Sequence, residues 1–336
     1  MVRRRDFLTL LGGASAASAL SRPFAASAQQ GDRGARIGVL SAYAETDPLQ
    51  RGYGSSFHRG LRDLGWIEGR NVHVDYRWSA GDVARMRMLA AELIQLAPDV
   101  ILTTNSPTTA AALQETRTIP IVFVTVSDPL GSGFVASLAR PGGNATGFTT
   151  VEGPMAGKWL EMLKEIAPRV AHVAFMFNPA TASGGGSNFL EAFATAASSL
   201  AMNATPAAVR DEAEIERAIA ALGRESAGGL IVMPDITTTL HRDRIVALAA
   251  RHRLPAVYPY RFFATSGGLM SYGIDLNDLY RQSATYIDRI LKGEKPADLP
   301  VQAPTRFELV INVSTAKALG LEVPLHFQQL ADEVIE

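Results

Sequence analysis

Polar side chains follow several apolar stretches of the chain, and their types suit hydrogen bonding to a small molecule. Asn105 and Ser106 follow one apolar stretch. Ser127 and Asp128 follow the next stretch, and Asp235 follows a later one. A carboxylate can accept charge-assisted hydrogen bonds from an amine, and free N–H groups at a helix start can hold a carboxylate. These residues therefore indicate binding of a small polar ligand.

Several of the candidate residues also have a purely structural interpretation. Ser106 can cap a helix with no ligand present. Asp128 can be a turn residue ahead of Pro129. Tyr258 and Tyr272 end predicted strands, where either ring could stack on an aromatic ligand or simply pack in the core or the hinge. The sequence leaves these alternatives open.

The full set of candidate ligand-binding residues shares one property, which is an expected position at or just beyond the end of a strand. The segment 42–51 after the first strand is a candidate lid. The run 183–188, Ser-Gly-Gly-Gly-Ser-Asn, lacks the lysine of a phosphate-binding loop, so a flexible loop is favoured over an anion-holding nest. The candidate residues are Ser41, Tyr43, Asn105, Ser106, Thr108, Ser127, Asp128, Thr149, Asn178, Asp235, Tyr258 and Tyr272.

Patterns typical of enzymes and metal sites are missing. The chain has no cysteine and six histidines, and no H-E-x-x-H motif joins them, so no metal is expected. No G-x-S-x-G motif occurs, and the glycines around Tyr53 do not complete a dinucleotide fingerprint. We therefore expect neither an enzyme nor a cofactor. The net charge of −1, with no basic run beyond the start of the chain, argues against nucleic acid as a partner.

The first 28 residues have the pattern of a secretory signal. Arg4 and Arg5 precede an acid-free apolar stretch at 10–20, and an Ala-Ser-Ala tripeptide ends at Ala28. Paired arginines favour the twin-arginine route, with the general export route as the alternative. A membrane span needs about 20 apolar residues, more than this stretch offers. The sequence therefore predicts cleavage near Ala28 and a periplasmic protein with no membrane span after processing.

Strand and helix patterns alternate along most of the chain and should position the candidate residues. Near-continuous apolar strands joined by helices indicate parallel sheets covered on both faces. The pattern occurs twice, with a break near 141–149. Strands are predicted at 36–41, 71–78, 99–104, 119–126, 170–177, 204–209, 229–233, 255–258, 268–272 and 307–312, and helices at 53–64, 83–96, 107–116, 154–166, 188–200, 212–222, 238–251, 276–291 and 314–319.

The elements after residue 276 are too few for a third domain, so they should be shared between two Rossmann-like lobes. We expect an N-terminal lobe of residues 36–147 plus 273–298 and a C-terminal lobe of residues 148–272 plus 299–336. Several chain crossings between lobes make a hinge. Ligands of open parallel sheets bind beyond the carboxyl ends of the strands, so the lobes should hold a ligand between them.

Several segments together resemble the bacterial ABC transporter substrate-binding family that includes tryptophan- and tyrosine-binding members. The resemblance implies an α/β fold of two hinged lobes, like the type I periplasmic binding proteins. It also implies delivery of a small aromatic or amino-acid-like ligand to an ABC permease in the inner membrane. The alternatives are a sensing clamp for a membrane receptor and an exported enzyme. The segments that carry the resemblance are 118–123, 127–129, 138–147, 267–273, 296–300, 307–312 and 316–320.

Overall fold

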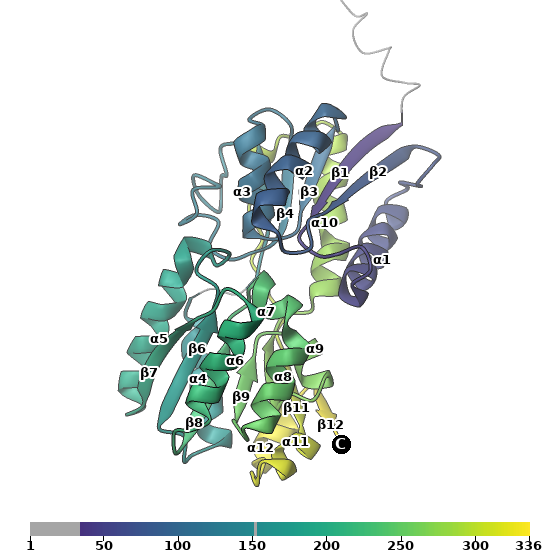
Figure 1. Cartoon of the computed structure of the whole chain (residues 1–336). Helices are drawn as coiled ribbons and strands as arrows, with labels where there is room; N and C mark the ends of the chain where they lie inside the picture. Colours follow the sequence, from purple (N-terminus) through teal and green to yellow (C-terminus); the bar gives the residue numbers. More distant parts are fainter. Residues whose placement is uncertain (1–33, 151–152) are drawn as a thin grey trace, which may run out of the picture. The chain divides into compact units, whose positions relative to one another are not determined.

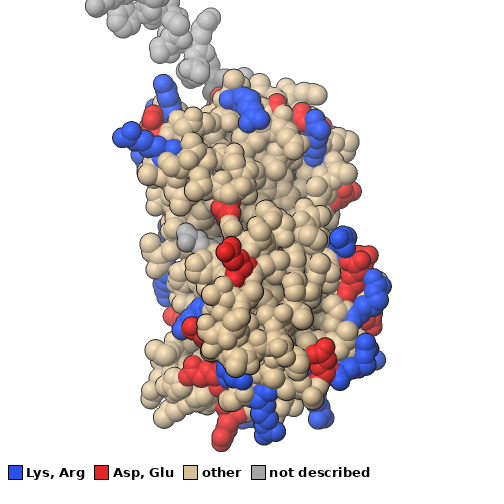
Figure 2. Space-filling view, turned by 90° about the vertical axis from the view of Figure 1, so that its left-hand side faces the viewer, with Lys and Arg blue, Asp and Glu red and all other residues tan. Residues whose placement is uncertain are grey.

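The computed structural model describes residues 34–150 and 153–336, which form two β-sheets flanked by helices (Figure 1). The predicted signal segment, residues 1–28, lies outside the described residues. No helix in the described part has the length and hydropathy of a membrane span. On the face shown in Figure 2, acidic and basic side chains are interspersed rather than gathered in one basic patch.

The first sheet has five parallel strands in the order β2-β1-β3-β4-β5. Alternate residues of its strands enter two clusters on opposite faces: Val122 packs in one and Phe123 in the other. The strands are β1 (Ala35–Ser41), β2 (Val72–Trp78), β3 (Val100–Thr103), β4 (Ile121–Val126) and β5 (Ala145–Thr149), and the helices beside them are α1 (Pro48–Asp63), α2 (Val83–Gln95), α3 (Ser106–Glu115) and α10 (Leu276–Leu291).

The second sheet has seven strands in the order β12-β11-β10-β9-β8-β6-β7. β11 runs antiparallel to β10, and the other pairings are parallel. The strands are β6 (His172–Phe177), β7 (Asn203–Ala208), β8 (Gly228–Val232), β9 (Ala256–Tyr258), β10 (Met270–Gly273), β11 (Glu308–Asn312) and β12 (Glu333–Ile335). The helical segments are α4 (Met155–Ile166), η1 (Ser183–Gly186), α5 (Ser187–Ser199), α6 (Glu212–Leu222), α7 (Ile236–Leu240), α8 (Arg242–Arg251), α9 (Arg261–Thr265), η2 (Pro296–Asp298), α11 (Val313–Ala318) and α12 (Leu325–Leu330).

Helix α10 comes late in the sequence but packs in the first half of the fold. Its buried residues recur three and four positions apart, which makes one apolar face. This face lies against α1 and the first sheet, and the two helices approach so closely that a Cβ on Gly60 would stand 2.4 Å from the carbonyl oxygen of Arg281. The chain therefore leaves the first sheet after β5, returns through α10, and leaves it again before β11. We propose that the two lobes follow these two sheets.

Several local predictions from the sequence differ from the structure. β11 breaks the expected all-parallel pattern of the second sheet. The helix predicted at 238–251 is divided at His241 into α7 and α8. Asn312, not Ser314, caps α11, because its side chain accepts the Thr315 N–H at 2.9 Å. The short elements β5, α9, α12 and β12 were not predicted, since three to six residues carry little periodicity.

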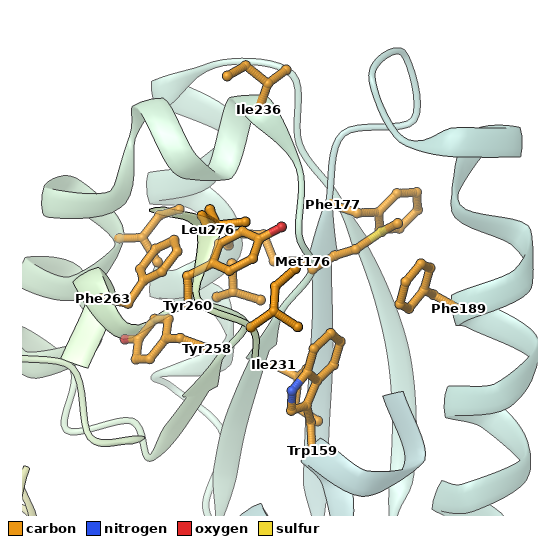
Figure 3. Close-up of a cluster of buried hydrophobic side chains, with 14 of the residues drawn as sticks. Trp159, Met176, Phe177, Phe189, Ile231, Ile236, Tyr258, Tyr260, Phe263 and Leu276 are labelled. Atoms are coloured by element: carbon orange, nitrogen blue, oxygen red, sulfur yellow. The ribbon is translucent and has the colours of Figure 1, made fainter. Parts of the chain in front are cut away.

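Aromatic side chains make up much of the core of the second half. Trp159 of α4 is completely buried. Figure 3 shows it with Phe177 and Phe189 on one side and Tyr258 and Phe263 on the other. The rings of Trp159 and Phe189 are stacked with centroids 6.2 Å apart, and those of Tyr258 and Phe263 lie 4.9 Å apart. This cluster ties α4 and α5 to the sheet beneath them.

We predict that Trp159→Ala lowers the free energy of unfolding by about 3–5 kcal/mol, because a large cavity replaces a buried ring. The variant also loses the hydrogen bond from the indole N–H to the carbonyl oxygen of Tyr272, which is 2.7 Å long. Urea unfolding followed by circular dichroism measures the change. Trp159→Phe, which keeps most of the volume, should lose less, and an Ala variant as stable as the wild type would contradict this packing.

Candidate functional site

A cavity lies where the carboxyl ends of strands from the two sheets face each other. Loops after β1, β3 and β4 form one wall, and loops after β6, β8 and β9 form the other. Its free volume is only about 30 Å³, so the two walls nearly touch. The lining residues are Tyr43, Thr104, Asn105, Ser106, Pro107, Thr125, Ser127 and Leu276 from the first half, and Thr181, Ala182, Ser183, Pro234, Asp235, Ile236, Thr239 and Tyr260 from the second.

Asn105 is the N-cap of α3 and lines the cavity. Its Oδ1 accepts the backbone N–H of Thr108 at 2.9 Å, and the Thr108 hydroxyl accepts the Asn105 N–H at 3.1 Å. This capping box fixes the amide orientation, because Oδ1 must face the N–H group. The other amide atom, Nδ2, is buried and has no hydrogen-bond partner. The Asn105 side chain therefore presents a free neutral donor to the site.

Ser106 does not cap the helix, so the prediction for its cap role is wrong. Its hydroxyl lies 2.7 Å from the hydroxyl of Ser183, which comes from the opposite wall. Ser183 also donates to the carbonyl oxygen of Ser127 at 2.5 Å. Because a hydroxyl has one proton, Ser106 must be the donor to Ser183. The two walls are thus joined by a short hydrogen-bonded chain.

Outside the cavity wall, two more contacts join the two halves of the fold. The guanidinium of Arg242 lies 3.3 Å from a carboxylate oxygen of Asp47, and both side chains are largely buried, at 13% and 11% exposure. Asn188 donates to the carboxylate of Asp128. Together with the serine chain, these contacts describe a closed arrangement of the cavity walls.

The glycine-rich run before α5 is an ordered turn, not the flexible loop favoured from the sequence. Gly184, Gly185 and Gly186 have φ angles of 55°, 64° and 84°. Residues with a side chain rarely take this left-handed conformation, and three in a row depend on glycine. The turn places Ser183 in the cavity and Asn188 at the start of α5. The glycines therefore serve the contacts between the walls.

Asp235 is the N-cap of α7, and its side chain is almost completely buried in the wall of the cavity. Its carboxylate accepts the Thr237 N–H at 2.8 Å, the Thr238 N–H at 3.4 Å and the Thr181 hydroxyl at 2.5 Å. Burial outweighs these hydrogen bonds and raises the pKa of Asp235 to about 6. Among the described residues, no Lys, Arg or His side chain lies within 4.0 Å of it. The carboxylate is a buried acid with no cationic partner.

The structure places five of the predicted site residues in the cavity wall: Tyr43, Asn105, Ser106, Ser127 and Asp235. The sequence missed Tyr260, Thr125, Thr181 and Ser183, which also line it. Thr181 and Ser183 lie in the loop that Asn178 had marked, and Tyr260 lies two residues after the candidate Tyr258. The sequence therefore identified the correct loops but not the particular residues in them that line the cavity.

Four of the other predicted residues lie one layer away from the cavity. The Ser41 hydroxyl donates to Gln50 at 2.8 Å, and Thr108 belongs to the capping box of α3. Asn178 donates to the Thr237 hydroxyl at 2.8 Å, so it supports the loop beside Asp235. Tyr258 is buried in the core against Phe263. Tyr258 is the last residue of β9, so its ring packs within the sheet layer rather than in the loop beyond it, which lines the cavity.

Asp128, Thr149 and Tyr272 also lie outside the cavity. Asp128 and Thr149 line a separate surface depression of about 640 Å³ beside α5. The ladder between β4 and β5 is irregular after Phe123, and Asp128 has a φ of 47°, so its side chain turns toward Asn188. Tyr272 packs on the ring of Phe307, with centroids 5.7 Å apart. The structure gives no support for Asp128 as an amine partner in the cavity.

Buried tyrosines lie behind the first wall. The rings of Tyr53 and Tyr280 are stacked 4.7 Å apart, and Tyr43 meets Tyr53 edge-on at 5.7 Å. Burial raises the pKa of all three hydroxyls above their usual range, so they stay protonated at neutral pH. The described residues hold no cluster of three or more acidic or histidine side chains suited to a metal ion.

Comparison with known proteins identifies the family. The family model described as "ABC transporter substrate binding protein" matches residues 37–335. The chain belongs to this family. It is 25% identical over 287 residues to a tyrosine-binding protein of Clostridioides difficile (strain R20291), which covers 85% of this chain and 80% of that protein. The resemblance stated from the sequence is therefore confirmed.

Two solved structures share the fold. A conserved domain protein from Vibrio cholerae O1 biovar El Tor is 27% identical, covers 90% of this chain and 100% of that chain, and has a TM-score of 0.83. A Streptococcus pneumonia ABC domain in complex with L-Trp is 25% identical, with the same coverage and a TM-score of 0.83. These matches confirm the predicted α/β fold of two lobes and a solute-binding rather than an enzymatic family.

We predict that the stability difference between the wild type and Asp235→Asn depends on pH. The raised pKa means that the folded protein holds this proton more tightly than the unfolded chain, so wild-type stability falls as pH rises from 3.8 to about 6. The full pKa shift corresponds to a loss of at most about 3 kcal/mol in the free energy of unfolding. The loss is smaller if the walls part and water reaches the carboxylate. Asparagine keeps the helix cap but does not titrate.

Urea unfolding of both proteins between pH 4.5 and 7.5 measures this difference. The Asn variant should gain stability relative to the wild type as the pH rises. A difference that stays constant over this range would show that Asp235 is hydrated in the folded protein.

Proposed function

We propose that this chain is the periplasmic solute receptor of an ABC importer and that it binds an aromatic amino acid or a similar molecule. The observation that carries the proposal is the cavity between the strand ends of the two lobes, with equal contributions from both walls. The relatives support the class of ligand, because one is named for tyrosine and another was solved with L-Trp. The pattern of residues 1–28 supports export with cleavage near Ala28.

Ligand binding would be coupled to closure of the lobes. The free volume of about 30 Å³ is far too small for an aromatic amino acid, so the walls must part before a ligand can reach the cavity. The ligand would then bridge the walls and stabilise a closed form. The chain passes between the two sheets in three places, which suits a hinge. The permease in the inner membrane would recognise the closed form.

We predict that L-tyrosine or L-tryptophan raises the melting temperature of residues 29–336. A ligand present at 100 times its Kd stabilises the protein by about 2.7 kcal/mol. Differential scanning fluorimetry detects the shift, and L-alanine and glucose serve as negative controls. Small-angle X-ray scattering should show a smaller radius of gyration with the bound ligand. If no aromatic amino acid shifts the transition, the proposed ligand class is wrong.

We further predict that Arg242→Ala weakens ligand binding about fivefold, chiefly through faster dissociation. The variant loses the contact with Asp47, which joins the walls only in the closed form and is worth about 1 kcal/mol. Arg244→Ala is the matched control, because Arg244 lies on the same helix but pairs with Glu212 and Glu216 of its own lobe. Equal affinities of the two variants would contradict a role for the Asp47 contact in closure.

A further inference from the structure

We propose that the cavity selects its ligand through a protonated amine that binds Asp235, and that a ligand carboxylate is dispensable. The ligand class would then include aromatic amines that have no carboxylate. This inference rests on the proposed function and specifies the chemistry of the ligand. It comes from the distribution of charge around the cavity and from the hydrogen bonds already formed there.

Among the described residues that line the cavity, Asp235 alone carries a charged side chain, and none is Lys, Arg or His. The nearest cation joining the lobes, Arg242, does not line the cavity. It is already occupied by Asp47 and by the carbonyl oxygen of Thr239, 3.1 Å away. The charge of the described wall therefore attracts a cationic group of a ligand and does not attract an anionic group.

The start of α3 offers a ligand carboxylate one backbone N–H, that of Ser106, and little else. The Thr108 N–H is taken by the side chain of Asn105, and Pro107 has no N–H group. The hydroxyl protons of Ser106 and Ser183 are used within the chain that joins the walls. Among the fully buried side-chain atoms of the described wall, Nδ2 of Asn105 has no hydrogen-bond partner, and it suits a neutral acceptor as well as a charged one. A buried carboxylate needs more compensation than neutral donors alone supply.

Asp235 makes closure over an empty cavity unfavourable. Three hydrogen bonds hold its carboxylate in place, yet burial still raises its pKa to about 6. Near neutral pH, closing the walls would bury an unpaired negative charge. A protonated amine removes this penalty, because it pairs with the carboxylate in the closed form. The same contact would thus provide both selectivity and the bias toward closure.

Four related compounds separate the contributions of the amine and the carboxylate: L-tyrosine, tyramine, 3-(4-hydroxyphenyl)propionate and N-acetyl-L-tyrosine. Isothermal titration calorimetry at pH 7.5 should give tyramine an affinity within tenfold of that of L-tyrosine. The two compounds without a protonated amine should bind at least 100-fold more weakly. The inference is overturned if the propionate binds as well as L-tyrosine, or if L-tyrosine binds and tyramine does not.

Asp235→Asn tests the residue directly, because asparagine keeps the helix cap and removes the charge. The variant should lose at least 100-fold in affinity for L-tyrosine and tyramine. Without a ligand, it should be more compact than the wild type by small-angle X-ray scattering at pH 7.5. Asp211→Asn is the matched control, since Asp211 caps α6 on the exposed surface and should show neither change.

The two proposals can fail separately. If none of the four compounds binds but Asp235→Asn closes the empty cavity, the proposed aromatic ligand is wrong and the inference about Asp235 stands. If L-tyrosine binds to the variant as to the wild type, or if the empty variant scatters like the wild type, the inference about Asp235 is wrong and the receptor function stands.

Discussion

Parallel strands bring the loops that follow them to one edge of a sheet, and the rest of this structure depends on two such edges facing each other. The edge of the first sheet presents Asn105 and Ser127, and the edge of the second presents Asp235 and Tyr260. Neither edge alone encloses a molecule. Because α10 returns to the first half of the fold, the chain links the two sheets repeatedly, and such multiple crossings suit a hinge between the facing edges.

The balance between open and closed forms depends on the size of opposing contributions. The bonds between serine hydroxyls and the Asp47–Arg242 pair each contribute on the order of 1 kcal/mol in favour of closure. An unpaired buried carboxylate opposes closure by a few kcal/mol. These contributions are comparable in size. A ligand can therefore reverse the preference of the empty protein for one form. A ligand that neutralises Asp235 removes the largest opposing contribution and adds its own contacts to both walls.

Periodic patterns in the sequence predicted most of the fold, whereas the site depended on details that have no period. The helix Leu276–Leu291 was predicted with its observed bounds, because its apolar residues recur over four turns. The loops that form the cavity were also predicted, since they follow strongly apolar strands. The particular side chains were harder: Tyr258 ends β9 and packs in the core, whereas Tyr260, the second residue beyond the strand, lines the cavity. The irregular ladder after Phe123 likewise turns the Asp128 side chain away from the cavity.

The turn at Gly184–Gly186 shows why composition alone misjudges such a segment. A run of three glycines is flexible in an unfolded chain, and that is the usual meaning of the pattern. Here the three glycines adopt left-handed φ angles, which the shape of this turn requires. The turn sets the Ser183 hydroxyl against the opposite wall. Ordering the glycines lowers their entropy, so the turn must be held by other contacts. Part of the support is local, because Ala182 donates its N–H to Asn178 and Gly185 donates its N–H to Ala182. The contacts with Ser106, Ser127 and Asp128 come from the other half of the fold, so closure of the cavity adds to the order of the turn.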